Sequence, residues 1–156
     1  MSSTRLDCHL RAPRERVYRA LTDARAIARW RVPPGMRSEV HAFDARVGGA
    51  IRVSLTYELE GRAGKSSART DTYHGRFAQL VANECVVEEL EFETDDPALQ
   101  GTMRVSFELH DEPGGTLLRA WHDGVPRGVS PADNEKGWRE SLARLAALVE
   151  DDPGAA

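Results

Sequence analysis

One long amphipathic helix at the C-terminal end of the chain limits the folds open to it. The helix is predicted over residues 131–149, and its start is marked by Ser130-Pro131, which combines a capping hydroxyl with a first-turn proline. Its apolar residues recur at helical spacing along one face: Trp138, Leu142, Leu145 and Val149. A stripe of this length has to be buried against an apolar surface, which the preceding residues must supply.

Seven segments before this helix alternate apolar and polar residues, as half-buried β-strands do. Residues 102–109 are the clearest, with Met103, Val105 and Phe107 on one face and polar side chains on the other. Glycine-rich turns separate several segments, and residues 60–67 form a predicted hairpin loop. The strands are predicted over residues 4–11, 38–44, 50–58, 70–80, 85–94, 102–109 and 116–123.

Two short helices are predicted between the first two strands, over residues 14–21 and 24–30. Proline at position 13 ends the first strand and suits the first turn of a helix, and Thr22 or Asp23 caps the second helix. A chain of 156 residues favours one domain, predicted over residues 1–150, with residues 151–156 as a disordered tail.

These elements predict a fold of the α+β class. A curved seven-stranded antiparallel sheet has one face to bury, and the C-terminal helix is the long amphipathic element available to cover it. A sheet that wraps around one helix leaves space that side chains do not fill, and concave apolar sites of this kind bind small molecules.

Composition and motifs exclude several function classes. The net charge is −4 with acidic and basic residues interleaved, so no basic patch predicts nucleic-acid binding. No apolar stretch approaches the roughly 20 residues of a membrane span, and the first ten residues lack a signal-peptide pattern, which predicts a cytoplasmic protein. The sequence has no metal-ligand spacing, nucleophile motif or phosphate-binding glycine loop, so no metal, cofactor or catalytic residue is predicted.

The sequence resembles proteins similar to the C-terminal domain of the heat-shock-protein-90 ATPase activator, which belong to the START-like, helix-grip superfamily. The resemblance spans residues 10–148. Its landmarks are Ala12-Pro13, Glu15, Val17, Ala20-Leu21-Thr22-Asp23, Trp30, Asp44, Arg46, Gly48-Gly49, Tyr73-His74-Gly75-Arg76-Phe77, Gly114-Gly115-Thr116 and Gly137-Trp138.

The resemblance implies a helix-grip fold with a cavity between the sheet and the long helix. The wider superfamily includes lipid carriers, polyketide cyclases and aromatases, and plant hormone receptors, and the fold alone does not choose among them. The family name implies stimulation of a chaperone ATPase and so a link to the stress response.

The cavity is predicted to bind an apolar small molecule through eight residues. Aromatic side chains are favoured because they offer large contact areas, and tyrosine adds a hydroxyl that orients a ligand. The predicted ligand-binding residues are Trp30, Tyr57, Arg76, Phe77, Phe107, Trp121, Trp138 and Leu142.

Two other functions remain open on the sequence. A cyclase-like or aromatase-like enzyme would use His74, Arg76, His122 or Tyr57 as acid–base groups that converge in the cavity. An interaction protein that stimulates a chaperone would need an exposed apolar or charged patch. A second copy of the chain, forming a homodimer, is a further candidate partner.

The remaining candidate residues are assigned structural roles. Glu89, Glu91 and Glu93 alternate with apolar residues and are predicted to form a solvated face, whereas a buried glutamate would need a partner. Gly137 lies inside the last helix, where glycine costs about 1 kcal/mol relative to alanine. Close approach of the helix to the sheet rim is the predicted reason for this glycine.

Overall fold

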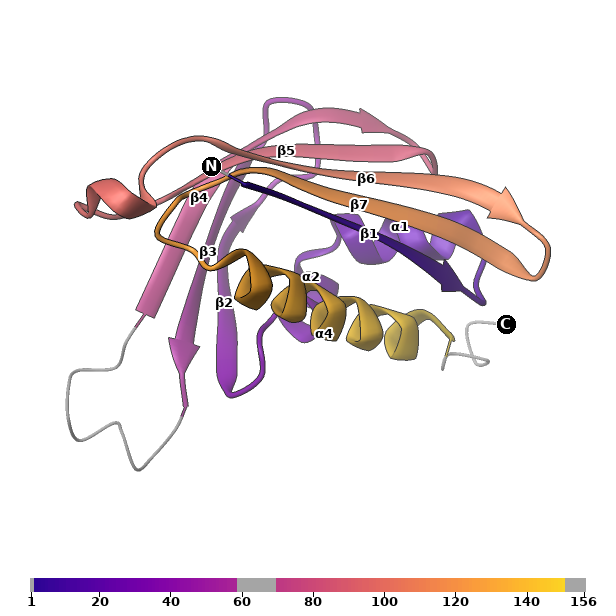
Figure 1. Ribbon diagram of the computed structural model, residues 1–156. Helices are drawn as coiled ribbons and strands as arrows, with labels where there is room; N and C mark the ends of the chain where they lie inside the picture. Colours follow the sequence, from indigo (N-terminus) through magenta and orange to yellow (C-terminus); the bar gives the residue numbers. More distant parts are fainter. Residues whose placement is uncertain (1, 59–69, 151–156) are drawn as a thin grey trace.

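The computed structural model describes residues 2–58 and 70–150, and the predicted hairpin loop and C-terminal tail lie outside the described residues. The chain order is strand, two helices, six strands and a long helix (Figure 1). The elements are β1 (Ser2–Leu10), α1 (Arg14–Thr22), α2 (Ala24–Trp30), β2 (Met36–Phe43), β3 (Ala50–Tyr57), β4 (Thr70–Val81), β5 (Cys85–Phe92), the 3-10 turn η1 (Pro97–Leu99), β6 (Met103–Glu112), β7 (Gly115–Val125) and α4 (Pro131–Glu150).

All seven strands belong to one antiparallel sheet in the order β1-β7-β6-β5-β4-β3-β2. Consecutive strands pair as hairpins except at β1, which crosses to the far edge and pairs with β7. The sheet curves, and α4 lies along its concave side with α1 and α2 (Figure 1). The predicted α+β helix-grip architecture is therefore confirmed, with element boundaries shifted by a few residues.

The core lies between the concave face of the sheet and the helices. Alternate residues of each strand point into the core. On β3 these are Ile51 and Val53, and on β6 they are Met103, Val105 and Phe107, all of which are buried. The side chain of Trp30 is fully buried from α2, and its indole nitrogen donates a hydrogen bond to the carbonyl of Ala20 at 2.9 Å. That bond ties the two short helices together and satisfies the only polar group of the ring.

The predicted glycine turn after β2 is confirmed. Gly48 has a φ of 83°, a conformation that glycine adopts with little cost. A Cβ on Gly49 would lie 1.8 Å from the carbonyl oxygen of Asp44, so a side chain has no room there. The turn returns the chain directly into β3.

No helix in residues 2–58 and 70–150 combines the length and apolar character needed to cross a membrane.

Candidate ligand-binding cleft

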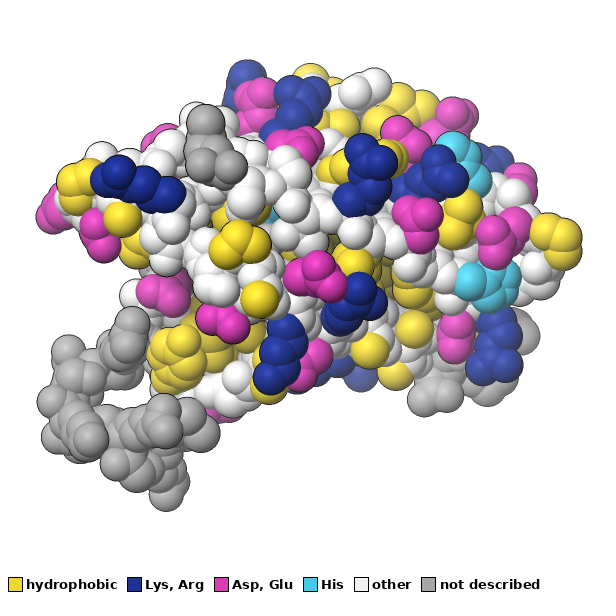
Figure 2. Space-filling model, viewed as in Figure 1, with side chains coloured by type: hydrophobic (Ala, Val, Ile, Leu, Met, Phe, Trp, Pro, Cys, Tyr) yellow, Lys and Arg dark blue, Asp and Glu magenta, His cyan; other side chains and the backbone are white. Residues whose placement is uncertain are grey.

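An open cleft of about 290 Å³ lies between the N-terminal half of α4 and the central strands of the sheet. Its lining residues come from the segment between α2 and β2, strands β3 to β7, the segment between β7 and α4, and α4 itself: Arg31, Pro33, Leu55, Tyr73, Leu90, Phe92, Met103, Val105, His122, Val129, Asp133, Asn134, Gly137, Trp138 and Ser141. In Figure 2, hydrophobic side chains form the surface below the first turns of α4. The cleft is thus mostly apolar, with a small number of polar groups, as small-molecule sites are.

The aromatic part of the cleft surrounds a cation. The guanidinium carbon of Arg31 lies 5.3 Å from the ring centre of Trp138 and 5.8 Å from those of Tyr73 and Phe107. Arg31 directly follows the last residue of α2, so the end of this helix places the guanidinium group between α4 and the sheet. A cation held at these distances is attracted to the negative faces of the rings.

Glu88 on β5 provides the counter-charge for Arg31. Nη1 of Arg31 donates to both carboxylate oxygens of Glu88, at 2.8 and 3.1 Å, and the two side chains are 10% and 0% exposed. Burial acts to lower the pKa of Arg31, but the charge of Glu88 and the proximity of Tyr73 outweigh it and raise that pKa. Each side chain of this pair is therefore the buried partner of the other. The pair was not predicted from the sequence, although Glu88 shares the parity of the buried Val86 and Leu90.

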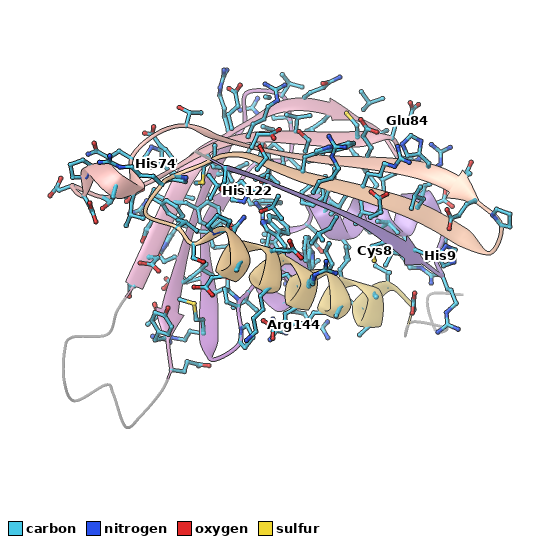
Figure 3. The ribbon with its side chains drawn as sticks, in the orientation of Figure 1. Cys8, His9, His74, Glu84, His122 and Arg144 are labelled. Carbon is cyan, nitrogen blue, oxygen red and sulfur yellow. The ribbon has the colours of Figure 1, made fainter. Side chains whose placement is uncertain are left out.

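His122 on β7 lies at the back of the cleft, beside the N-terminal half of α4 (Figure 3). Its Nδ1 accepts a hydrogen bond from the indole nitrogen of Trp138 at 3.0 Å and faces the amide nitrogen of Asn134 at 3.2 Å. An indole only donates, so Nδ1 carries no proton, and Nε2 carries it toward the sulfur of Met103 at 3.1 Å. Burial, and then the charge of Arg31, lower the pKa of His122 to about 4. The imidazole is thus neutral at pH 7.

Two hydroxyl groups of the lining make no hydrogen bond with any described residue: those of Tyr73 and Ser141. Tyr73 is 8% exposed, and burial raises its pKa, so the hydroxyl keeps its proton and remains a donor. Ser141 is buried on α4. An unpaired hydroxyl in an apolar wall is costly unless a ligand or water satisfies it.

Gly137 has a different role from the predicted one. A Cβ at this position would find no atom within 4 Å, so close approach of α4 to the sheet does not explain the glycine. Gly137 lines the cleft instead. A mid-helix glycine costs about 1 kcal/mol relative to alanine, and here its missing side chain leaves the cleft open.

Of the eight predicted ligand-binding residues, Trp138 lines the cleft. Trp30, Phe77, Phe107 and Leu142 are buried in the surrounding core, where Phe107 packs edge-on against Trp138 with ring centres 5.9 Å apart. These four belong to the packed core and are not among the residues that line the cleft.

The other three predicted residues lie elsewhere. Trp121 is on the convex face of β7, where the guanidinium carbon of Arg5 lies 5.4 Å from its ring centre, because neighbouring residues of a strand face opposite sides. Arg76 lies on the same convex face of β4 and pairs with Glu89 at 2.8 Å. Tyr57 is 41% exposed at the end of β3, beyond the part of that strand covered by the core.

The acid–base groups considered for an enzyme do not converge. His122 alone of the four lines the cleft. His74 lies on the convex face of β4, 3.1 Å from Glu91 and 3.0 Å from Glu93, so these glutamates belong to the predicted solvated face. Beside Arg52 and His74, the pKa of Glu93 falls to about 2.

The surroundings of the two cysteines disfavour a reactive thiolate. Cys8 and Cys85 are free and half-buried, and burial raises the pKa of both thiols, which disfavours the reactive thiolate. Residues 2–58 and 70–150 hold no group of three His, Cys, Asp or Glu side chains placed to bind a metal ion.

The curved sheet, the gripped C-terminal helix and the cleft between them define a START-like, helix-grip protein. The family model described as activator of Hsp90 ATPase homolog 1-like protein matches residues 11–150, and the chain belongs to this family. The resemblance seen in the sequence is thereby confirmed.

Solved structures of relatives agree with this assignment. A protein from Chromobacterium violaceum is 34% identical, with a TM-score of 0.85 over 97% of this chain and 100% of that one. An AHSA1-like protein from Aeromonas hydrophila is 20% identical, with a TM-score of 0.71 over 96% of this chain and 93% of that one, and shares the fold. An AHSA1 protein from Silicibacter pomeroyi is 19% identical, with a TM-score of 0.75 over 94% and 96% of the two chains. No curated protein matches the chain.

Proposed function

We propose that the protein binds an apolar small molecule in the cleft between α4 and the sheet. The observation that carries the proposal is the lining itself, in which leucine, valine, methionine and aromatic side chains predominate. Its polar groups are Arg31, Tyr73, His122, Asp133, Asn134 and Ser141. Such a wall favours the transfer of apolar surface out of water at about 25 cal/mol per Å². The binding needs no catalytic step.

Gly137 supports the proposal independently of the lining chemistry. Alanine would fit at this position and would favour the helix, yet the chain carries glycine. A ligand that uses the space beside α4 accounts for the lost helical stability.

The experiment compares three forms of the purified protein: wild type, Gly137→Ala and Gly137→Phe. Native mass spectrometry and solvent extraction are used to look for a co-purified ligand, and Trp fluorescence titration with a panel of hydrophobic compounds measures binding. The phenylalanine ring would occupy the cleft, so binding should fall at least tenfold, and the single methyl group of the alanine variant should weaken binding by a smaller factor.

The proposal is wrong if Gly137→Phe binds the panel as well as the wild type does. It is also wrong if no compound binds the wild type and no extracted ligand is found. A fold check by circular dichroism on all three forms separates a blocked cleft from an unfolded protein.

A second candidate is the interaction function, favoured by a cationic hollow beside α1, α2 and the end of α4. The residues Arg16, Arg19, Arg25 and Arg29 line it and form no ion pair with a described carboxylate. The one acidic residue of the lining, Asp23, uses its carboxylate to accept from the backbone N–H of Arg25. An acidic surface of a chaperone would complement this charge.

The interaction candidate is tested by titrating an Hsp90-type ATPase with wild-type protein and with Arg19→Glu/Arg29→Glu. Stimulation by the wild type that the charge-reversed protein loses would support it. An unchanged ATPase rate with the wild type would remove it.

A further inference from the structure

We infer that the bound molecule carries an uncharged hydrogen-bond acceptor, such as a ketone or ester carbonyl, which Arg31 and Tyr73 hold inside the cleft. This inference rests on the proposed function and specifies the ligand class of the same site.

The guanidinium group of Arg31 has N–H donors that no described residue accepts from. A guanidinium carries five N–H groups, and only Nη1 of Arg31 donates to Glu88. Its Nε and Nη2 atoms donate no hydrogen bond to any described residue, although the side chain is only 10% exposed and lines the cleft. Neither atom is among the fully buried polar atoms without a partner, so both reach the open space of the cleft, where an acceptor on a ligand can replace water as their partner.

Tyr73 offers a second donor from the same wall. Its ring centre lies 5.8 Å from the guanidinium carbon of Arg31, and its hydroxyl has no described hydrogen-bond partner. One oxygen atom has two lone pairs, so a single carbonyl can accept from both side chains at once. The Ser141 hydroxyl on α4 is available to a second polar atom of the ligand.

The charges around the cleft favour a neutral acceptor over a carboxylate. Glu88 already neutralises Arg31, and His122 is neutral near pH 7, so neither leaves a positive charge to balance an anion. Asp133 on α4 adds a negative charge to the lining. An anionic ligand would lose its hydration in an apolar site without gaining a counter-charge, which is strongly unfavourable.

The test uses three probes of nearly equal shape: 2-ethylnaphthalene, 2-acetylnaphthalene and 2-naphthoate. Dissociation constants are measured at pH 7.5 by fluorescence titration. A charge-assisted hydrogen bond adds on the order of tenfold in affinity, so the ketone should bind about tenfold more tightly than the hydrocarbon. The carboxylate should bind more weakly than the ketone.

Two variants assign the preference to the residues. Tyr73→Phe removes one hydroxyl and should reduce the advantage of the ketone over the hydrocarbon several-fold. Arg31→Met/Glu88→Leu replaces the whole ion pair with apolar side chains and should reduce that advantage further while keeping the hydrocarbon bound. Arg76→Met, which removes an arginine from the convex face, is the control and should leave all three constants unchanged.

The outcomes separate the two claims. If the hydrocarbon binds and the ketone binds no better, or if the carboxylate binds most tightly, the inference is wrong while the proposed cleft function stands. If Tyr73→Phe and the double variant both keep the full preference for the ketone, the assignment to these residues is wrong. If none of the probes binds the wild type and the extraction finds no ligand, both claims fail together.

Discussion

The C-terminal half of α4 closes a packed core, whereas its N-terminal half borders an open cleft. In the C-terminal half, Leu142, Leu145 and Val149 are 4%, 0% and 2% exposed and pack with the sheet and the short helices. Toward the N-terminal end, Gly137 and Ser141 present little or no side chain to the cleft, and Trp138 forms part of its wall. One helix therefore borders both regions, because the small residues Gly137 and Ser141 leave space beside it, whereas Leu142, Leu145 and Val149 fill the core.

The two halves also differ in polarity. The inward side chains of the closed half are aliphatic, whereas the open half faces buried polar groups: the Arg31–Glu88 pair and the hydrogen bonds of His122. Buried polar groups stabilise only when each has its partner. We therefore expect the closed half to respond mainly to changes in volume and the open half mainly to changes in charge and pH.

The largest expected effect is at the open half, from removing one member of the ion pair. Arg31→Met leaves the fully buried Glu88 without a partner and should lower the free energy of unfolding by about 4 kcal/mol. Urea denaturation measures the change. Arg31→Met/Glu88→Leu should recover most of the loss, and a double variant as unstable as the single one would show that the charges are not the cause.

The second-largest expected effect comes from reducing the volume of a side chain in the closed half. Leu145→Ala removes a fully buried side chain and should lower the free energy of unfolding by about 3 kcal/mol through lost burial and a residual cavity. The same denaturation assay applies, and Ala143→Gly on the exposed side of α4 reports the helix-propensity effect alone. A loss at Leu145 no greater than that of the control would contradict the packed-core assignment.

The pH dependence of stability should depend on the open half through His122. Its pKa is about 4 when folded and near 6.5 when unfolded, so above pH 6.5 the imidazole is neutral in both states and costs nothing. As the pH falls from 6.5 to 4, His122 is protonated in the unfolded chain but stays neutral in the folded one, so the free energy of unfolding decreases. Between pH 7 and 5 the loss should be about 2 kcal/mol.

His122→Gln keeps an acceptor for the Trp138 indole but does not titrate, so it is the matched control for the pH effect. Thermal denaturation at pH 7 and 5 should show a smaller shift for the variant than for the wild type. Equal shifts would assign the pH dependence to other groups. Glu93, with its pKa lowered to about 2, loses its contribution only as the pH falls from 4.5 to 2, below this window.

The smallest effect has the opposite sign. Gly137→Ala should raise the free energy of unfolding by about 1 kcal/mol, because alanine favours the helix and its methyl group meets no neighbour. Differential scanning calorimetry can resolve the increase in melting temperature. A destabilised alanine variant would mean that the helix approaches the sheet at this point after all.

Local patterns in the sequence were enough to predict the strands, the three main helices and most of the core. Alternation along β6 and helical spacing along α4 both record which side of an element faces the interior, so the α+β helix-grip class followed. The alternation also put His122 and Trp121 on opposite faces of their strand, but the sequence prediction named Trp121 as the cavity residue, whereas His122 lines the cleft.

Only the tertiary structure decided which of the inward residues line the cleft and which are sealed in the core. Phe77, Phe107 and Trp138 were equal candidates by pattern, yet Trp138 alone of these borders open space. The pairing of Arg31 with Glu88 joins residues far apart in the chain, and the open space at Gly137 depends on how α4 lies against the strands opposite it. Periodicity reports which side of an element faces inward, but a cavity and an ion pair depend on distances between elements, which the folded chain alone sets.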